Sequence, residues 1–159
     1  MDVQLFIDAD VFLQEAERYL AADPSSASVI AVYAGRVRAG RQPRGRGAPR
    51  VAVTAGGRVV GLAVHTPFHR LFGARMPGPA AVAVAEALAE HHRTLPGVNG
   101  ESSAEASFAA AWQERPGEAA VEDVRMRIYC LGDLKSPAWV PGEHGLASAY
   151  DTGWPPSGW

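Results

Sequence analysis

The chain has 159 residues, of which 47% are hydrophobic and 20% charged, as expected for a globular protein with a buried core. The formal net charge of −2 argues against a dedicated nucleic-acid binder. The single cysteine, Cys130, excludes an intrachain disulfide and fits a reducing compartment. The apolar runs are too short to cross a bilayer, and the acidic N-terminus does not match the basic start of a signal peptide. We therefore expect a cytoplasmic protein that contacts neither nucleic acid nor membrane.

The first part of the chain indicates two helices. Apolar residues share one face over residues 10–22, where Asp8 or Asp10 can cap a helix and Pro24 follows its end. A second helix is predicted over residues 26–39. Its β-branched residues leave a strand as the alternative for this segment.

A loop and a β-hairpin follow. Residues 40–50 are rich in arginine, glycine and proline and have no hydrophobic period, which predicts a loop. The arginines around this loop lack interleaved aromatic residues for base stacking, so a solvated loop is favoured over a nucleic-acid contact.

The β-rich runs 50–54 and 58–64 flank Gly56-Gly57 and predict a hairpin. Residues 71–73 suit a short third strand.

The second part alternates helices with strands. A helix with proline at its first position is predicted over residues 79–92, and residues 95–100 have room for a brief strand. A capping box, Ser102 to Glu105, opens a helix that runs to about residue 115. Alternation over residues 124–131 predicts a strand with two distinct faces. This order predicts an α/β fold with mixed strand pairing, in a domain over residues 1–140 followed by a proline-, glycine- and tryptophan-rich tail over residues 141–159.

One short motif lies at the entry to the helix over residues 79–92. The sequence RMPGPA has the pattern R-x-x-G-x-A, in which Arg75, Gly78 and Ala80 occupy the defined positions. Together with the element order, this motif resembles the GNAT acyltransferase superfamily. Phrases such as FLQEAERYLAAD, GGRVVGLAVHTPFH and VRMRIYCLGDL extend the resemblance from residue 10 to about 140 and are similar to the N-terminal half of two-domain actinobacterial GNAT proteins. The resemblance implies a GNAT-like, mostly antiparallel sheet flanked by helices, and a following second domain that usually carries the acetyl-CoA site.

The resemblance assigns the pyrophosphate of acetyl-CoA to Arg75, Gly78 and Ala80. Such an anion is held by successive backbone N–H groups at the N-terminus of a helix. Pro77 and Pro79 lie at the variable positions of the motif and have no N–H to donate. A helix that begins with proline after a turn explains the same residues without a ligand.

Catalysis in this superfamily transfers an acyl group directly from a thioester to an amine, which needs a base and an acid. Tyr129 can supply a hydroxyl, and Glu101, Glu105 or His65 can act as the base. The sequence shows no partner for any of them, so the catalytic residues stay unassigned.

The histidines and the cysteine do not predict a site of their own. His65 and His69 lie four residues apart, but Thr66-Pro67 between them excludes a regular helix that would bring both to one metal. Cys130 alternates with apolar residues and is expected to be a small buried hydrophobic residue. We expect no metal site.

Three functions remain as hypotheses. The first is a stand-alone GNAT-like N-terminal domain, degenerate for acetyl-CoA, that acts as an interaction or substrate-side module. It would pair with itself as a homodimer, or with a complete GNAT protein, through exposed strand edges. The second is an active acetyl-CoA-dependent N-acetyltransferase of a small amine. The third is a truncated gene product without independent function.

Overall fold

The computed structural model describes residues 1–41, 49–65, 69–91, 94–115 and 119–130, and residues 132, 133, 135 and 138. Its elements are β1 (Asp2–Phe6), α1 (Ala9–Ala22), α2 (Ser28–Arg38), β2 (Arg50–Ala55), β3 (Arg58–His65), β4 (Leu71–Gly73), α3 (Gly78–Ala89), β5 (Val98–Asn99) and α4 (Ser102–Gln113). Contacts group the chain into two units, Met1–Ile128 and Tyr129–Trp159, and these elements belong to the first. The predicted boundary between residues 140 and 141 stays a prediction. Most of the expected loop over residues 40–50 and the whole expected tail lie outside the described residues.

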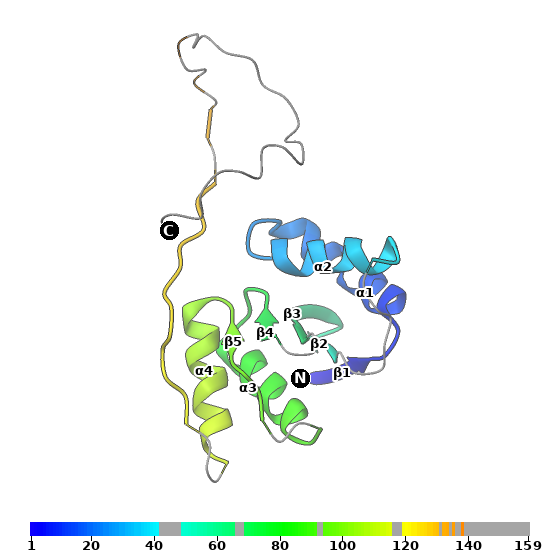
Figure 1. Cartoon of the computed structure of the whole chain (residues 1–159). Helices are drawn as coiled ribbons and strands as arrows, with labels where there is room; N and C mark the ends of the chain where they lie inside the picture. Colours follow the sequence, from blue (N-terminus) through cyan, green and yellow to red (C-terminus); the bar gives the residue numbers. More distant parts are fainter. Residues whose placement is uncertain are drawn as a thin grey trace, which may run out of the picture. The chain divides into compact units, whose positions relative to one another are not determined.

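In the described part of the chain, five strands form one open sheet in the order β1-β2-β3-β4-β5 (Figure 1). Neighbouring strands are antiparallel except for β4 and β5, which pair in parallel through Leu71 with Val98 and Phe72 with Asn99. A parallel pair needs a crossover connection, and α3 supplies it. The prediction of an α/β fold with a mixed, mostly antiparallel sheet is confirmed.

The β2–β3 hairpin is also confirmed. Ala55 pairs with Arg58, which leaves Gly56 and Gly57 as the two loop residues. Their φ angles are +58° and +74°, so both occupy the left-handed region that a type I′ turn requires and that glycine adopts without steric cost.

Helices cover both faces of the sheet. Successive residues of a strand point to opposite faces, so β2 and β3 contribute to two apolar clusters. The cluster under α1 and α2 includes Phe12, Ile30, Ala52, Leu62 and Val64. The cluster under α3 and α4 includes Val51, Val53, Ala63, Leu88 and Phe108. Each side of the sheet therefore has its own core.

Arg50, the first residue of β2, is fully buried on the α1–α2 side. Its Nη1 donates to the carbonyl oxygen of Ile7 at 2.8 Å, and its Nη2 donates to the hydroxyl oxygen of Tyr33 at 2.8 Å. The guanidinium carbon lies 5.6 Å from the centre of the Tyr33 ring. A buried charge is costly unless its donors are satisfied. These bonds therefore hold the connection after β1 and the helix α2 to the start of β2.

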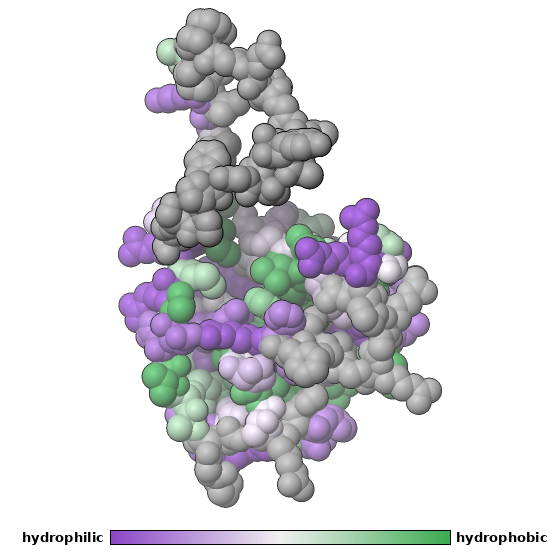
Figure 2. Space-filling view, in the orientation of Figure 1, coloured by the Kyte–Doolittle hydropathy of each residue, from purple (hydrophilic) through white to green (hydrophobic). Residues whose placement is uncertain are grey.

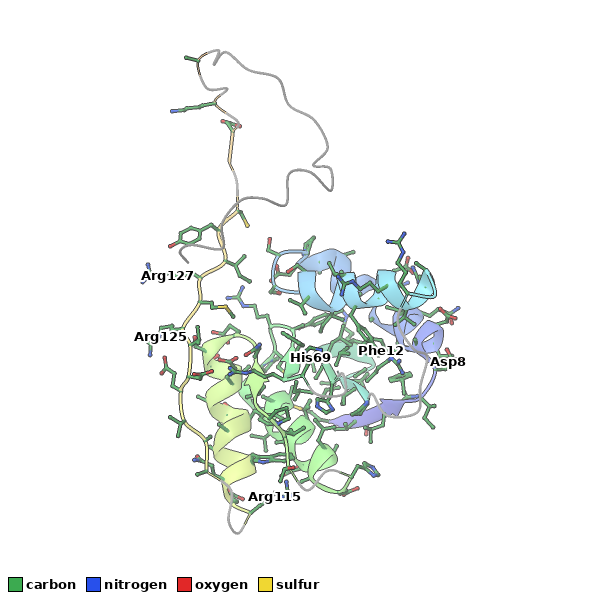
Figure 3. The ribbon with its side chains drawn as sticks, in the orientation of Figure 1. Asp8, Phe12, His69, Arg115, Arg125 and Arg127 are labelled. Carbon is green, nitrogen blue, oxygen red and sulfur yellow. The ribbon has the colours of Figure 1, made fainter. Side chains whose placement is uncertain are left out.

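Strand β1 was not among the elements predicted from the sequence. It pairs with β2 over its whole length, from Asp2 opposite Thr54 to Phe6 opposite Arg50. Asp8, labelled in Figure 3, then caps α1 by accepting from the backbone N–H of Asp10 at 2.8 Å. Of the two caps that the sequence allowed, Asp8 is the one used.

The prediction that Ser102 caps the last helix is wrong by one residue. The structure places Ser102 inside α4 and makes Glu101 the N-cap, because the Glu101 carboxylate accepts from the backbone N–H of Ala104 at 3.4 Å. Glu105 accepts a hydrogen bond from the backbone N–H of Gly100. Two carboxylates thus accept from backbone N–H groups at the start of α4, but Glu105 bonds Gly100 and not the N-cap residue, so the reciprocal pair of a capping box is not formed.

The strand predicted over residues 124–131 is wrong for the residues that the structure describes there. Residues 124–130 form no strand and are exposed. Cys130 is therefore exposed, which corrects its expected burial. Alternating apolar residues favour a strand only where a neighbouring strand completes the hydrogen-bond ladder, and no described strand pairs with this segment.

Loss of the Tyr33 hydroxyl should destabilise the fold. In Tyr33→Phe the buried Nη2 of Arg50 loses its acceptor, so we expect the free energy of unfolding to fall by about 1–3 kcal/mol. Urea denaturation measures this change. Tyr19→Phe is the matched control, because the Tyr19 hydroxyl makes no hydrogen bond to a described residue, and we expect a change within about 0.5 kcal/mol. Equal losses in both variants would contradict the role given to the Arg50–Tyr33 bond.

Candidate functional site

The motif over residues 75–80 forms the corner between β4 and α3. Pro77 is the N-cap of α3, with an extended backbone of φ −61° and ψ 146°, and Gly78 is the first helical residue. The N-terminus of α3 thus follows the carboxyl end of β4, the strand that pairs in parallel with β5. Anionic ligands of α/β proteins bind in this position because helix N–H groups and the helix dipole face it.

The corner offers few free backbone donors. Pro77 and Pro79 have no N–H. The N–H of Ala80 donates to the carbonyl oxygen of Pro77 at 2.9 Å, and that of Ala81 donates to the same oxygen at 3.1 Å. Within the first turn of α3, Gly78 is left as the residue whose N–H can face a ligand.

Packing accounts for the two small residues of the motif. A Cβ added at Gly78 would lie 2.8 Å from the Oγ of Ser107 on α4. This distance is too short for a van der Waals contact, so one of the two groups would have to move. Ala80 is fully buried, and a Cβ added at Gly61 of β3 would lie 3.5 Å from the Cβ of Ala80. Gly78 therefore lets α3 approach α4, and Ala80 lets α3 approach the sheet.

Arg75 is exposed and lies near acidic groups of two other elements. Hydrogen bonds with Ser26 lower the pKa of Asp23, which follows α1, and the charge of Arg75 lowers it further. Hydrogen bonds with Ser103 lower the pKa of Glu101, and Arg75 again adds a smaller effect in the same direction. A phosphate at this corner would compete with both carboxylates for the Arg75 guanidinium.

The space beyond the parallel strands is small. A cavity of about 20 Å³ lies among β4, β5, α3 and α4, and its lining includes Met76, Gly100 and Phe108. A space of this size holds about one water molecule. Glu105 also lines it, and burial raises the pKa of this carboxyl although the hydrogen bond from Gly100 acts in the opposite direction.

A larger cavity, of about 220 Å³, lies between α2 and the β3–β4 side of the sheet. Its lining residues are Val29, Ile30, Val32, Tyr33, Arg36, Val64, His69 and Phe72. None of the residues assigned to the acetyl-CoA site is among them. In the sequence, this cavity is indicated only by the i, i+3, i+4, i+7 spacing of Val29, Val32, Tyr33 and Arg36, which places them on one face of a helix. The same spacing is equally typical of a helix packed on a core.

Within the first unit, the other residues singled out in the sequence do not assemble into one site. Glu101 and Glu105 lie together at the start of α4, where both are engaged in capping. His65 is buried at the end of β3, whereas His69 is exposed. Tyr129 belongs to the second unit and is exposed.

Two further findings concern the described residues alone. No group of three or more histidine, cysteine, aspartate or glutamate side chains among them is placed to hold a metal ion. None of the helices that they form has the length and hydrophobicity to cross a membrane.

The packing role of Gly78 can be tested with a double-mutant cycle. Gly78→Ala should lower the free energy of unfolding by about 1 kcal/mol, because the Ser107 Oγ must leave its 3.0 Å hydrogen bond to the carbonyl oxygen of Ser103. In a Ser107→Ala background the same change should be neutral or stabilise the fold by up to about 1 kcal/mol. Thermal and urea unfolding of the four proteins measure the cycle. Additive effects would show that Gly78 is not required by its contact with α4.

Comparisons of the chain with protein-family models, with curated proteins and with solved structures returned no match in any of the three.

Proposed function

We propose that the chain is a GNAT-like domain, degenerate for acetyl-CoA, that acts as an interaction or substrate-side module. Two features support the GNAT-like assignment. The chain passes from two helices through a hairpin and β4 to α3, and then to β5 parallel with β4. The R-x-x-G-x-A motif lies at the corner where α3 begins.

The observation that carries the degenerate assignment is the shortage of backbone donors at the start of α3. A pyrophosphate needs several N–H groups that converge on it. Here two prolines have none, and the N–H of Ala80 is already used by Pro77. In addition, an acyl arm directed past the carboxyl ends of β4 and β5 would meet a cavity of about 20 Å³.

The interaction role rests on an unpaired segment of the first unit. Figure 1 draws residues 119–128 in yellow as a trace without helix or strand. Four apolar side chains of this segment are between 63% and 87% exposed: Val121, Val124, Met126 and Ile128. Figure 2 shows hydrophobic residues at the surface among hydrophilic ones on the face that it presents. A β-forming segment that pairs with no described strand is suited to strand addition with another chain.

We propose a second copy of this chain as the partner, with a complete GNAT protein as the other candidate. The short segment Glu122–Asp123–Val124–Arg125 carries two acids before a base. When two copies pair antiparallel about Val124, Asp123 of each copy lies opposite Arg125 of the other, in exchange for the ion pairs that Asp123 forms with Arg70 and Arg125 forms with Glu122 within the chain. Opposite charges that face each other across strands stabilise the pair.

The second candidate function is an active acetyl-CoA-dependent N-acetyltransferase of a small amine. The exposed guanidinium of Arg75 at the entry to α3 favours it, because a phosphate can reach that group. In this case Arg75, Gly78 and Ala80 would hold the cofactor, and the base and acid remain to be assigned.

Titration calorimetry with acetyl-CoA and CoA distinguishes the two functions. For the natural chain we expect no binding heat up to about 1 mM ligand, a threshold that corresponds to about 4 kcal/mol of binding energy. Pro79→Ala restores one N–H to the first turn and should give measurable binding, which Arg75→Ala should then remove. Micromolar binding by the natural chain that is lost in Arg75→Ala would contradict the degenerate loop and establish the cofactor site.

The self-association has its own measurement. Sedimentation velocity over about 1–100 μM protein should show a dimer that forms with increasing concentration, in the range of weak interfaces. Met126→Pro should abolish the dimer, because proline has no N–H for a strand ladder. Met126→Leu keeps both the N–H and the apolar side chain and should retain it. A natural chain that stays monomeric throughout would exclude the second copy as the partner.

A further inference from the structure

The cavity between α2 and the β3–β4 side of the sheet combines apolar walls with two basic side chains, Arg36 and His69. Its floor is formed by the buried residues Ile30, Tyr33 and Val64. Val29 and Val32 are 48% and 58% exposed, although both face this hollow. Large apolar side chains left exposed around a cavity mark a surface that a ligand can cover.

Arg36 is the charged side chain of the described lining. Arg36 and His69 are exposed members of the lining, and the described residues that line the cavity include no carboxylate. Figure 3 labels His69 below α2, in the connection that leads into β4. Neither of the salt bridges found among the described residues, Arg70 with Asp123 and Arg125 with Glu122, uses Arg36. The guanidinium of Arg36 is thus available to an anion.

A further positive charge lies behind the cavity wall. The Tyr33 hydroxyl oxygen accepts from the fully buried Arg50, and this bond does not consume the hydroxyl proton of Tyr33. The Nε of Arg50 has no hydrogen-bond partner among the described residues. A cation buried without a carboxylate produces a positive potential that is weakly screened, because water is excluded from its surroundings. This potential adds to that of Arg36 and favours an anionic ligand.

We propose that this cavity binds a small monocarboxylate with a branched aliphatic or aromatic body. The carboxylate pairs with the guanidinium of Arg36, which matches it in planar geometry. The apolar body contacts Val29, Val32 and Phe72. The volume of about 220 Å³ is roughly ten times that of the cavity that holds about one water molecule, so a ligand of seven to ten heavy atoms is of suitable size. A free phosphate has no apolar part to bury and is a poorer match.

The inference goes beyond the proposed function and does not depend on it, because the cavity residues are not those of the β4–α3 corner. Titration with acetyl-CoA and titration with a carboxylate therefore fail or succeed separately.

The test is a titration of the full chain with isovalerate and with phenylacetate, followed by two-dimensional NMR of the backbone amides. We expect saturable shifts in α2 and in β4 with a Kd of about 1 mM, the affinity that the best small ligands of this size reach or exceed. Isovaleramide has the same shape without the charge, and its affinity should be about tenfold lower. Inorganic phosphate should cause no saturable shift in these elements.

Two variants of α2 locate the carboxylate. Arg36→Gln should weaken isovalerate binding about tenfold, because the charged partner is lost. Arg38→Gln removes an exposed arginine from the same turn of the helix that does not line the cavity, and it should change the Kd less than about twofold. Equal affinity for isovalerate and isovaleramide, or equal effects of the two variants, would overturn the proposal. The absence of saturable shifts with either acid at about 20 mM would also overturn it, since this concentration is far above the expected Kd.

Discussion

The buried guanidinium of Arg50 is the constraint on which one half of the structure depends. It joins the carbonyl group of Ile7, which follows β1, to the hydroxyl group of Tyr33 on α2. A charge in this position must keep its hydrogen bonds or lose a large solvation energy. The edge strand, the second helix and the start of the hairpin are therefore held in one arrangement. The same charge lies behind the cavity under α2, so a structural requirement also contributes to the electrostatic potential of that surface.

The other half of the structure depends on close approach between helices and sheet. Gly78 admits Ser107 of α4, and Ala80 packs against Gly61 of β3. These are the small residues that the acetyl-CoA assignment places next to a pyrophosphate. A motif of small residues at a helix start thus has two physical explanations, and the free backbone donors decide between them. At this corner the prolines and the bond from Ala80 to Pro77 leave few donors.

The parts of the fold that local chemistry controls were predictable. Gly56-Gly57 between two β-rich runs can adopt the two positive φ angles of a tight hairpin turn, and it does. Helices were predictable for the same reason, since each closes its own hydrogen bonds: α1 from its apolar face, α3 from the proline at its start and α4 from an expected cap, whereas α2 left a strand as the alternative. Strand β1 was not predicted, because Asp2–Phe6 is mostly exposed and becomes a strand by pairing with β2. The candidate site was predictable as a motif, but its free donors and its neighbours were not.

The sequence by itself determined the secondary-structure order from α1 to α4, the hairpin turn and the place of the R-x-x-G-x-A motif at a helix start, because each depends on residues close together in the chain. Tertiary structure alone decided three other matters. It placed Arg50 against Tyr33, residues that are 17 positions apart, and it opened the cavity beside them. It brought Ser107 against Gly78. It left residues 124–130 outside the sheet despite their strand-like alternation, because a strand is stabilised by a neighbour that its own sequence does not specify.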